Sequence, residues 1–282
     1  MRALQSNQNP TISDADFALL YPYIHQKYGI NLKRKKLLIN SRLAGVLDEY
    51  GFSNFHDYVQ EVISGRNPEL ASETLDRLTT NYTSFMRERE HFAYLKEHIL
   101  PELEKRHQRD HNIAIWSAAC STGEEPYTIS MYLMEYFGSR PGNWDVRVLA
   151  SDLSEEVLAS AQHPVYDKEA ISCFPETWQK RYFTPVSDSE VTITKELRSN
   201  VIYRQFNLME TPHFLLPFDV IFCRNVMIYF DQPTKDALIR RLYAVTVPDG
   251  YLFIGHSEGV NREACPYESV APAILQKKVA KK

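Results

Sequence analysis

The sequence predicts a small all-α region followed by an α/β domain with a mostly parallel sheet. From residue 11 to about 105, apolar residues recur at helical spacing and no strand-like alternation is seen. From residue 112 onward, short β-prone segments alternate with helical ones, a pattern typical of parallel strands joined by crossover helices. Residues 164–200 contain Pro164, Pro175 and Pro185 and break this alternation, which indicates an insertion.

Cap signals mark the helices of the first region. Ser13 is a predicted N-cap, Ser53 is expected to open a second short helix, and Asn67 precedes a first-turn proline. Residues 33–48 carry an apolar stripe at i, i+4, i+7 and i+8, formed by Ile39, Leu43, Val46 and Leu47. A last helix follows Phe92, and we expect Pro101 to interrupt it.

The second region yields an ordered set of strands and helices. Strands are expected at 112–119, 145–151, 201–206, 218–223, 251–255 and, added at the sheet edge, 273–279. Helices are expected at 126–137, at 154–162 with a serine cap, and at 233–245. A short β-like run at 191–194 lies inside the insertion.

Composition excludes several broad classes of protein. The 282 residues are 44% hydrophobic and 24% charged, which is ordinary for a globular protein and excludes a disordered chain. The polar residues at 5–9 stand where a signal peptide needs an apolar core, and no CxxC pair occurs among the four cysteines. We therefore expect a cytoplasmic protein without membrane insertion, disulfide framework or metal, and the net charge of −4 argues against nucleic-acid binding.

Positive charge is concentrated in one stretch of the helical region. No acidic residue occurs from Phe17 to Leu47, whereas this stretch holds six basic residues. With the apolar stripe buried, Arg34, Lys35 and Arg42 are expected to face solvent or an acidic partner. A merely solvated helix face is the alternative.

The ligand site is expected at the carboxyl ends of the parallel strands, as in other open α/β sheets. The first strand is followed by the small residues 118–123 and then by Glu124 and Glu125, with no GxGxxG motif. Two acids at a helix start are unsuited to a phosphate and favour a ligand with positive charge, although they also complement the helix dipole.

Polar residues follow the next strands as well. Asp152 stands where an acid commonly accepts hydrogen bonds from ribose hydroxyls, or where it could cap the next helix. Asn207-Leu208 and Arg224-Asn225 follow the third and fourth strands, where they could line a flat purine. A ribose- and purine-bearing ligand of cationic character corresponds to S-adenosylmethionine better than to NAD or ATP.

At this point the sequence resembles the chemotaxis receptor glutamate O-methyltransferases, the CheR family. The motifs that carry the resemblance are LTTNYTSFMR at 78–87, WSAACSTGEEPY at 116–127, ASD at 150–152, FCRNVMIYFD at 222–231 and PDGYLFIGHSE at 248–258. The resemblance implies a receptor-facing helical domain and linker at 1–87. It also implies a Rossmann-like methyltransferase domain at 88–282, with a small β-subdomain inserted at about 164–200.

The resemblance also implies a role for each matching residue. Asn81, Thr83 and Arg87 would reach over the cofactor from the linker. The remaining cofactor contacts would come from Glu124 or Glu125, Asp152, Asn207, Leu208, Arg224 and Asn225. Tyr229 would lie near the methyl group, and the carboxylate that accepts the methyl group would pair with Arg87. The implied products are glutamate methyl esters on chemoreceptor methylation helices and S-adenosylhomocysteine.

Three other functions compete with this one. Residues 255–259 fit the GxSxG pattern of α/β-hydrolases, but no histidine follows His256 to complete a triad. An S-adenosylmethionine-binding regulatory module without catalysis is a second alternative, which the intact Arg87 and Tyr229 disfavour. Methylation of nucleic-acid bases is a third, but an Asn-Pro-Pro-Tyr type of motif is absent.

The insertion also bears on how a receptor is held. Family members that tether to a receptor C-terminal pentapeptide have a longer, glycine-containing loop in the β-subdomain. The corresponding stretch here, 184–190, is short and contains no glycine. Tethering to such a pentapeptide is therefore not expected.

Overall fold

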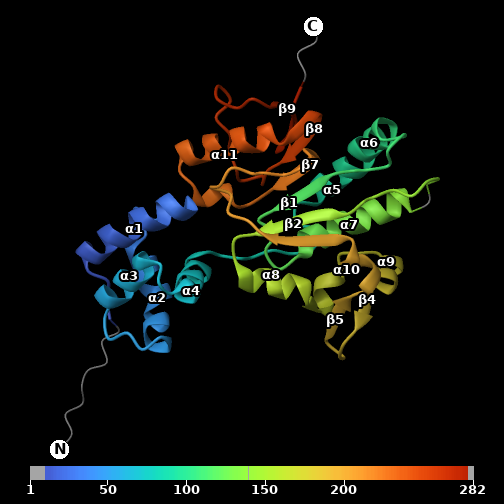
Figure 1. Cartoon of the computed structure of the whole chain (residues 1–282). Coiled ribbons are helices and arrows are strands. Elements are labelled where there is room, and N and C mark those ends of the chain that lie inside the picture. The colour runs from blue at the N-terminus through green and yellow to red at the C-terminus, as the bar shows by residue number, and fades with distance from the viewer. Residues whose placement is uncertain (1–9, 139, 279–282) are drawn as a thin grey trace, which may run out of the picture. The chain divides into compact units, whose positions relative to one another are not determined.

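The computed structural model describes residues 10–138 and 140–278 and divides into two compact units, Met1–Thr80 and Asn81–Lys282. The first unit is all-α and the second is built on a mixed sheet, as predicted (Figure 1). Over the described residues, no helix is long and apolar enough to cross a lipid bilayer.

From residue 10 onward, the first unit contains four helices, α1 (Asp14–Tyr28), α2 (Lys36–Glu49), α3 (Phe55–Ser64) and α4 (Pro68–Leu78). Ser13 and Asn67 are the N-caps of α1 and α4, as predicted, since each side chain accepts an N–H from the first turn. The predicted cap Ser53 is wrong: the side chain of Asn54 accepts the Asp57 N–H instead. Helix α1 packs against α3, and α2 packs against α4.

Helix α2 confirms the predicted apolar stripe but corrects one of the basic residues. Its four stripe residues are fully buried, and Arg34 and Lys35 are exposed just before the helix. Arg42, however, turns toward the end of α4, where its guanidinium donates to the carbonyls of Leu78 and Thr79, both at 2.9 Å. Because the last carbonyls of a helix lack partners within it, this contact satisfies groups that would otherwise be unpaired. Arg42 therefore has a structural role and does not face solvent freely.

The second unit begins with a nearly continuous helical segment. It consists of α5 (Arg89–Tyr94), a π-helical turn η1 (Leu95–Ile99) and α6 (Leu100–Arg106). The expected interruption at Pro101 is wrong, because the helical segment continues through it; Pro101 lies at the start of α6, directly after the π-helical turn. Phe92, Leu95 and Leu103 are buried against the sheet.

The main sheet has seven strands in the order β6-β2-β1-β7-β8-β10-β9. The five strands from β6 to β8 are parallel, and β10 and β9 are antiparallel additions. Their bounds are β1 Ile115–Ala118, β2 Val148–Asp152, β6 Val201–Gln205, β7 Phe218–Cys223, β8 Thr246–Phe253, β9 Glu268–Ala271 and β10 Ile274–Gln276. The predicted edge strand corresponds to β10, but it is not at the edge, because β9, for which no strand was predicted, pairs with its outer side.

Three helices connect the strands close to their predicted bounds: α7 (Glu124–Phe137), α8 (Glu155–Gln162) and α11 (Gln232–Ala244). Ser154 caps α8 as predicted, with its hydroxyl accepting the Val157 N–H. Helix α7 and the α5–α6 segment share one apolar cluster with β1, β7 and β8. On the opposite side of β1, Trp116 is fully buried and its ring packs near those of Phe214 and Phe218.

The insertion forms a separate three-stranded antiparallel sheet in the order β3-β5-β4. Its elements are β3 Val165–Asp167, the 3-10 turn η2 Lys168–Ile171, α9 Glu176–Tyr182, β4 Phe183–Pro185, β5 Glu190–Ile193 and α10 Lys195–Ser199. The buried ring of Phe85 packs edge-on against those of Tyr166, Phe174 and Phe183. The segment that carries Arg87 is therefore anchored in the inserted subdomain.

Candidate active site

A sharply turned loop follows β1 at the carboxyl edge of the sheet. Ala119, Ser121 and Gly123 all have positive φ, and Gly123 at +96° lies directly before α7. A Cβ at Gly123 would stand 3.0 Å from the Tyr203 hydroxyl and 3.0 Å from the Ala161 side chain. Only glycine fits this position, because its φ is positive and a side chain would crowd Tyr203, Ala161 and Tyr127.

Glu124 and Glu125 begin α7 but have different partners. Glu125 accepts the Ser117 hydroxyl at 2.7 Å and an Arg224 guanidinium N–H at 2.9 Å. Glu124 accepts the Thr122 hydroxyl at 2.7 Å. Burial raises the pKa of both carboxyls, and at Glu125 Arg224 opposes that rise. A positive ligand beside Glu124 would stabilise its charged form.

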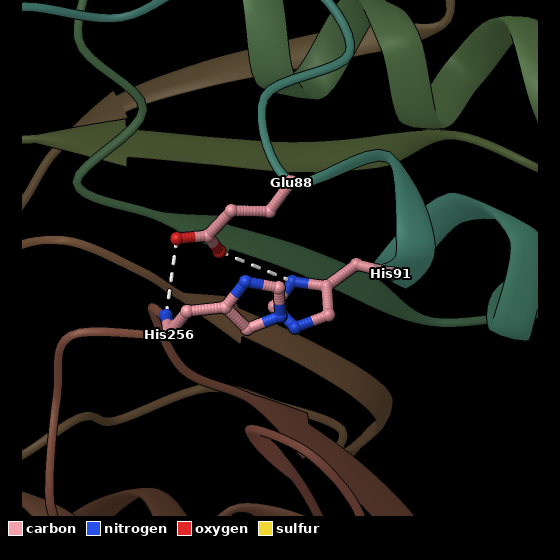
Figure 2. Close-up of side chains that lie close together, drawn as sticks. All are labelled: Glu88, His91 and His256. Atoms are coloured by element: carbon pink, nitrogen blue, oxygen red, sulfur yellow. Dashed lines mark hydrogen bonds and ion pairs between the residues drawn. The ribbon is translucent and has the colours of Figure 1, made fainter.

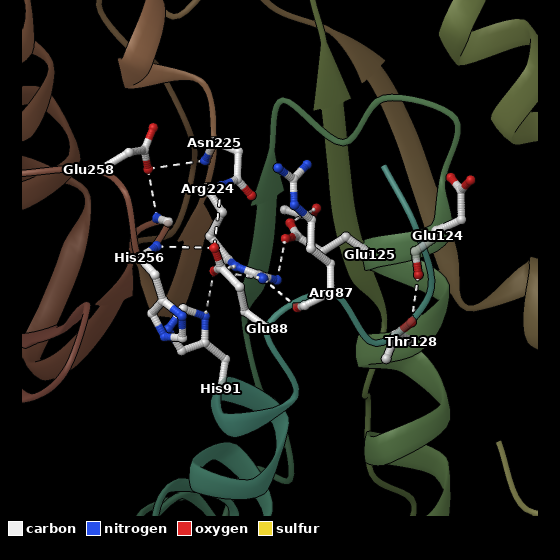
Figure 3. A network of polar contacts seen from close by, with 12 residues as sticks. Arg87, Glu88, His91, Glu124, Glu125, Thr128, Arg224, Asn225, His256 and Glu258 are labelled. Atoms are coloured by element: carbon white, nitrogen blue, oxygen red, sulfur yellow. Dashed lines mark hydrogen bonds and ion pairs between the residues drawn. The ribbon is translucent and has the colours of Figure 1, made fainter. Parts of the chain in front are cut away.

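Arg224, directly after β7, is the centre of a buried ion-pair network (Figure 3). Its side chain is 2% exposed and pairs with Glu88 and Glu125, each at 2.9 Å. It also donates to the backbone carbonyl of Arg87. One guanidinium thus holds the linker segment and the start of α7 at the strand ends. A guanidinium is suited to this role because its several N–H donors can bind two carboxylates at once.

Glu88 extends this network to the end of β8. It lies in the left-handed region with φ of 58° and accepts the His256 N–H at 3.0 Å and the Asn225 amide at 3.3 Å. Although burial acts to raise the pKa of Glu88, the His256 N–H and Arg224 hold it below the usual value. Glu88 was not among the predicted site residues, although it directly follows Arg87.

Glu258 is a second acid that was not among the predicted site residues. Its carboxylate accepts backbone N–H groups of Asn225 at 3.0 Å, Gly255 at 2.6 Å and Ile228 at 3.3 Å. These contacts fix the loop that leads to Tyr229 in the 3-10 turn η3 (Met227–Tyr229). Glu258 therefore supports the loop architecture here, and the 255–259 motif shows no arrangement that would orient a histidine toward Ser257.

The predicted ribose acid lies between the loop and α8. Asp152 ends β2 and accepts the Ser121 N–H at 2.9 Å and the Ser154 N–H at 3.1 Å. Burial raises the pKa of Asp152, while these N–H groups oppose the rise. The residue is half-buried, and its contacts hold the post-β1 loop beside β2.

The linker residues occupy the same unit as the sheet. The Asn81 carbonyl accepts the Ser121 hydroxyl at 2.7 Å, and Thr83 is half-buried. The Arg87 guanidinium donates to the Tyr82 carbonyl at 2.8 Å and lies 5.6 Å from the centre of the Tyr82 ring. In the described part of the chain Arg87 pairs with no carboxylate, so its other N–H donors are available to a ligand.

The remaining predicted residues lie in the loops after β6 and β7. The Asn207 side chain accepts the Met209 N–H at 2.9 Å, and Leu208 is buried. Asn225 has φ of 59° and lies against Gly255, where a Cβ would come within 2.5 Å of its amide nitrogen. Glycine at 255 therefore allows the loops after β7 and β8 to approach closely.

These features fit a ligand such as S-adenosylmethionine. The loop after β1 turns sharply at Gly123, and the acids Glu124, Glu125 and Asp152 gather at one edge of the sheet. The described residues between β1 and α7 include no lysine or arginine that would attract a phosphate.

Comparison with known proteins identifies the family. The model "CheR methyltransferase, SAM binding domain" matches residues 81–273, and "CheR methyltransferase, all-alpha domain" matches residues 15–79. The chain belongs to the CheR methyltransferase family. Its second unit is accordingly an S-adenosylmethionine-binding methyltransferase domain, which confirms the predicted family, fold and cofactor.

Curated relatives support this assignment over nearly the whole chain. A "Chemotaxis protein methyltransferase" of Borreliella burgdorferi is 38% identical over 96% of this chain and 97% of its own length. The Escherichia coli protein of the same name is 37% identical over 90% of this chain and 88% of its own. "Chemotaxis protein methyltransferase 1" of Pseudomonas aeruginosa is 35% identical over 93% and 97%.

Proposed function

We propose that this CheR family member transfers a methyl group from S-adenosylmethionine to glutamate side chains of chemoreceptors, forming methyl esters. The observation that carries the proposal is the Arg87 guanidinium, which is fixed by Tyr82 and has donors left for a carboxylate. When bound, S-adenosylmethionine supplies an electrophilic methyl group, and S-adenosylhomocysteine remains after transfer. The names of the relatives support a chemotaxis substrate.

The chain's own residues have a positioning task in this reaction. A glutamate has a reference pKa of about 4.3, so it is ionised at neutral pH and needs no general base. Arg87 would orient that carboxylate, and Tyr229 would lie beside the reacting methyl group. Orientation of this kind can contribute roughly 7–11 kcal/mol to lowering a barrier.

The three acidic residues at the site would help to bind the cofactor in different ways. Glu124, half-buried with a hydroxyl as its partner, would contact the positively charged amino-acid part directly, whereas Glu125 would act by holding Arg224. Asp152 would accept the ribose hydroxyls. Further contacts on the two sides of the cofactor would come from Asn81, Thr83, Asn207, Leu208 and Asn225.

The test of this function is methyl transfer from labelled cofactor to a panel of chemoreceptors. Alkali-labile label on receptor glutamates is the expected result, because methyl esters hydrolyse in base and N-methyl groups do not. Cofactor binding without transfer to any receptor of the panel would instead favour the regulatory module without catalysis.

Asp152→Ala is expected to weaken S-adenosylmethionine binding by about 1.5–3 kcal/mol, because ribose hydroxyls would lose a charged acceptor. Titration calorimetry measures the effect, and Asp188→Ala, which changes an exposed acid in the insertion, is the matched control. Unchanged affinity in a folded Asp152→Ala protein would remove this residue from the ribose contact.

Arg34→Glu combined with Lys35→Glu is expected to lower receptor methylation several-fold at low salt without changing cofactor affinity. Both side chains are exposed, and positive charge would steer an acidic receptor helix mainly by raising the association rate. The difference from the unmodified protein should shrink as salt rises, because the screening length is about 8 Å at 0.15 M. Arg42 is left unchanged because it holds the end of α4.

The matched control for that variant is Lys105→Glu with Arg109→Glu, which makes the same charge change at two exposed positions of the second unit. Wild-type methylation rates at low salt in the Arg34/Lys35 variant would exclude a role for this basic surface in substrate recognition.

Deleting the C-terminal pentapeptide of a cognate receptor is expected to leave its methylation largely intact. The loop between β4 and β5 closes tightly, with the Val186 N–H donating to the Glu190 carbonyl at 2.9 Å. The expectation rests on the shortness of this loop alone, since β3 and β4 are the outer strands of the small sheet. A tight complex with the isolated pentapeptide, measured by calorimetry, would contradict this expectation.

A further inference from the structure

Three metal-ligating side chains converge beside the ion-pair network (Figure 2). Glu88 precedes α5, His91 lies in its first turn, and His256 follows β8. One ligand atom from each residue lies within 4.8 Å of the others. Residues 88 and 256 are also joined directly, because the Glu88 carboxylate accepts the His256 N–H.

His91 is the most informative member of this cluster. It is 1% exposed, and within the described residues neither ring nitrogen makes a hydrogen bond of ordinary geometry, although the ring lies near the Pro272 backbone. Its Nδ1 lies 3.4 Å from a Glu88 carboxylate oxygen without forming a hydrogen bond of ordinary geometry. Burial and the nearby Arg224 hold the pKa of His91 at about 3, so its imidazole is neutral. A buried polar group without a partner calls for an explanation.

The two histidine rings face the same space. Their centroids are 4.7 Å apart with an interplanar angle of 70°, and the His91 ring also packs edge-on against Phe253. His91 is therefore held by packing, whereas His256 is exposed and its ring can adjust. Solvent reaches the cluster on the His256 side, which gives an ion a route of access and a position for water.

The charge beside the cluster is mixed. The Glu88 carboxylate lies 3.4 Å from His91 Nδ1, whereas the Arg224 guanidinium that pairs with Glu88 disfavours positive charge on His91. Arg224 already pairs with the Glu88 carboxylate and would keep that ligand oriented. Two imidazoles and one carboxylate suit zinc-like ions rather than calcium or magnesium, which prefer oxygen ligands alone.

We propose that Glu88, His91 and His256 form a binding site for a divalent transition-metal ion of the zinc class, with one coordination position open to solvent. The site lies next to Arg87 in the chain and adjoins two of the predicted cofactor contacts, because Glu88 accepts hydrogen bonds from Arg224 and Asn225. Three protein ligands and an open position are the arrangement in which zinc binds water or a further ligand.

Binding of Co²⁺ and Zn²⁺ to the full chain tests this site. The protein, without an affinity tag and dialysed against a chelator, is titrated with Co²⁺ and followed by visible absorption. It is then titrated with Zn²⁺ by calorimetry. We expect one ion per chain, an intense Co²⁺ spectrum typical of four or five ligands, and displacement by Zn²⁺ but not by Mg²⁺.

Two variants distinguish this site from adventitious binding by other histidines. His256→Ala, at an exposed position, should lower Zn²⁺ affinity at least about tenfold, whereas the matched His163→Ala should leave it unchanged. His91→Gln tests the buried ligand, with tryptophan fluorescence to confirm that it is folded. A weak octahedral Co²⁺ spectrum, or equal affinities in His256→Ala and His163→Ala, would overturn the proposal.

Discussion

Replacing Arg87 with alanine is expected to lower the rate of methyl transfer by about 10²–10³-fold, the usual range for loss of a fixed donor that acts on the reacting group. Binding of S-adenosylmethionine alone should change much less. The reason is that Arg87 has no carboxylate partner among the described residues, so its natural partner is a carboxylate that arrives with the substrate.

The measurement compares receptor methylation at saturating cofactor with cofactor affinity from calorimetry. Arg89→Ala, which removes an exposed arginine two positions away, is the matched control and should retain activity. Arg87→Lys should remain impaired, because an ammonium cannot present the two parallel donors of a guanidinium. Equal losses of transfer and cofactor binding in Arg87→Ala would make this residue a cofactor ligand, and full activity would exclude both roles.

Arg224→Met is expected to reduce the free energy of unfolding of the second unit by about 3–5 kcal/mol. Arg224 is 2% exposed, and its removal would leave Glu88 and Glu125, each 14% exposed, without their common counter-charge. The backbone carbonyl of Arg87 would also lose its donor. Cofactor affinity should fall as well, because Glu125 would no longer be held in place.

Urea denaturation followed by tryptophan fluorescence measures this change. Trp116, Trp144 and Trp178 all lie in the second unit, so the signal reports that unit alone. Lys180→Met is the matched control, because its ion pair with Glu176 is 80% and 85% exposed and such pairs contribute about 0–1 kcal/mol. A loss below about 1 kcal/mol in Arg224→Met would show that the two acids find other partners.

Local signals predicted the elements of the fold well. The caps at Ser13, Asn67 and Ser154 and the apolar stripe of α2 depend on residues three to eight positions apart, which a sequence displays directly. The five parallel strands were predictable because buried strands interrupt helical periodicity. Strand β9 was missed because it is a short, partly exposed addition without that signal.

Contacts between distant residues were not predictable in the same way. Arg42 binds the end of α4, 36 residues away from it at Leu78, and nothing in the local pattern of α2 separates it from a solvated arginine. Glu88 meets Arg224 across 136 residues. The positions of Glu124, Glu125 and Asp152 at one edge followed from the rule for strand ends, but their hydrogen-bond partners depend on side-chain geometry that only the structure shows.

The anchoring of Phe85 constrains how this enzyme can diverge. Phe85 packs into the aromatic interior of the inserted subdomain, only two residues before Arg87. Substitutions at Phe174 or Phe183 would therefore shift the segment that carries Arg87. The outward loop between β4 and β5 shares no such contact in the described structure. Selection can therefore lengthen or decorate that loop to acquire new receptors, while the inner face of the same subdomain must keep its shape for catalysis to persist.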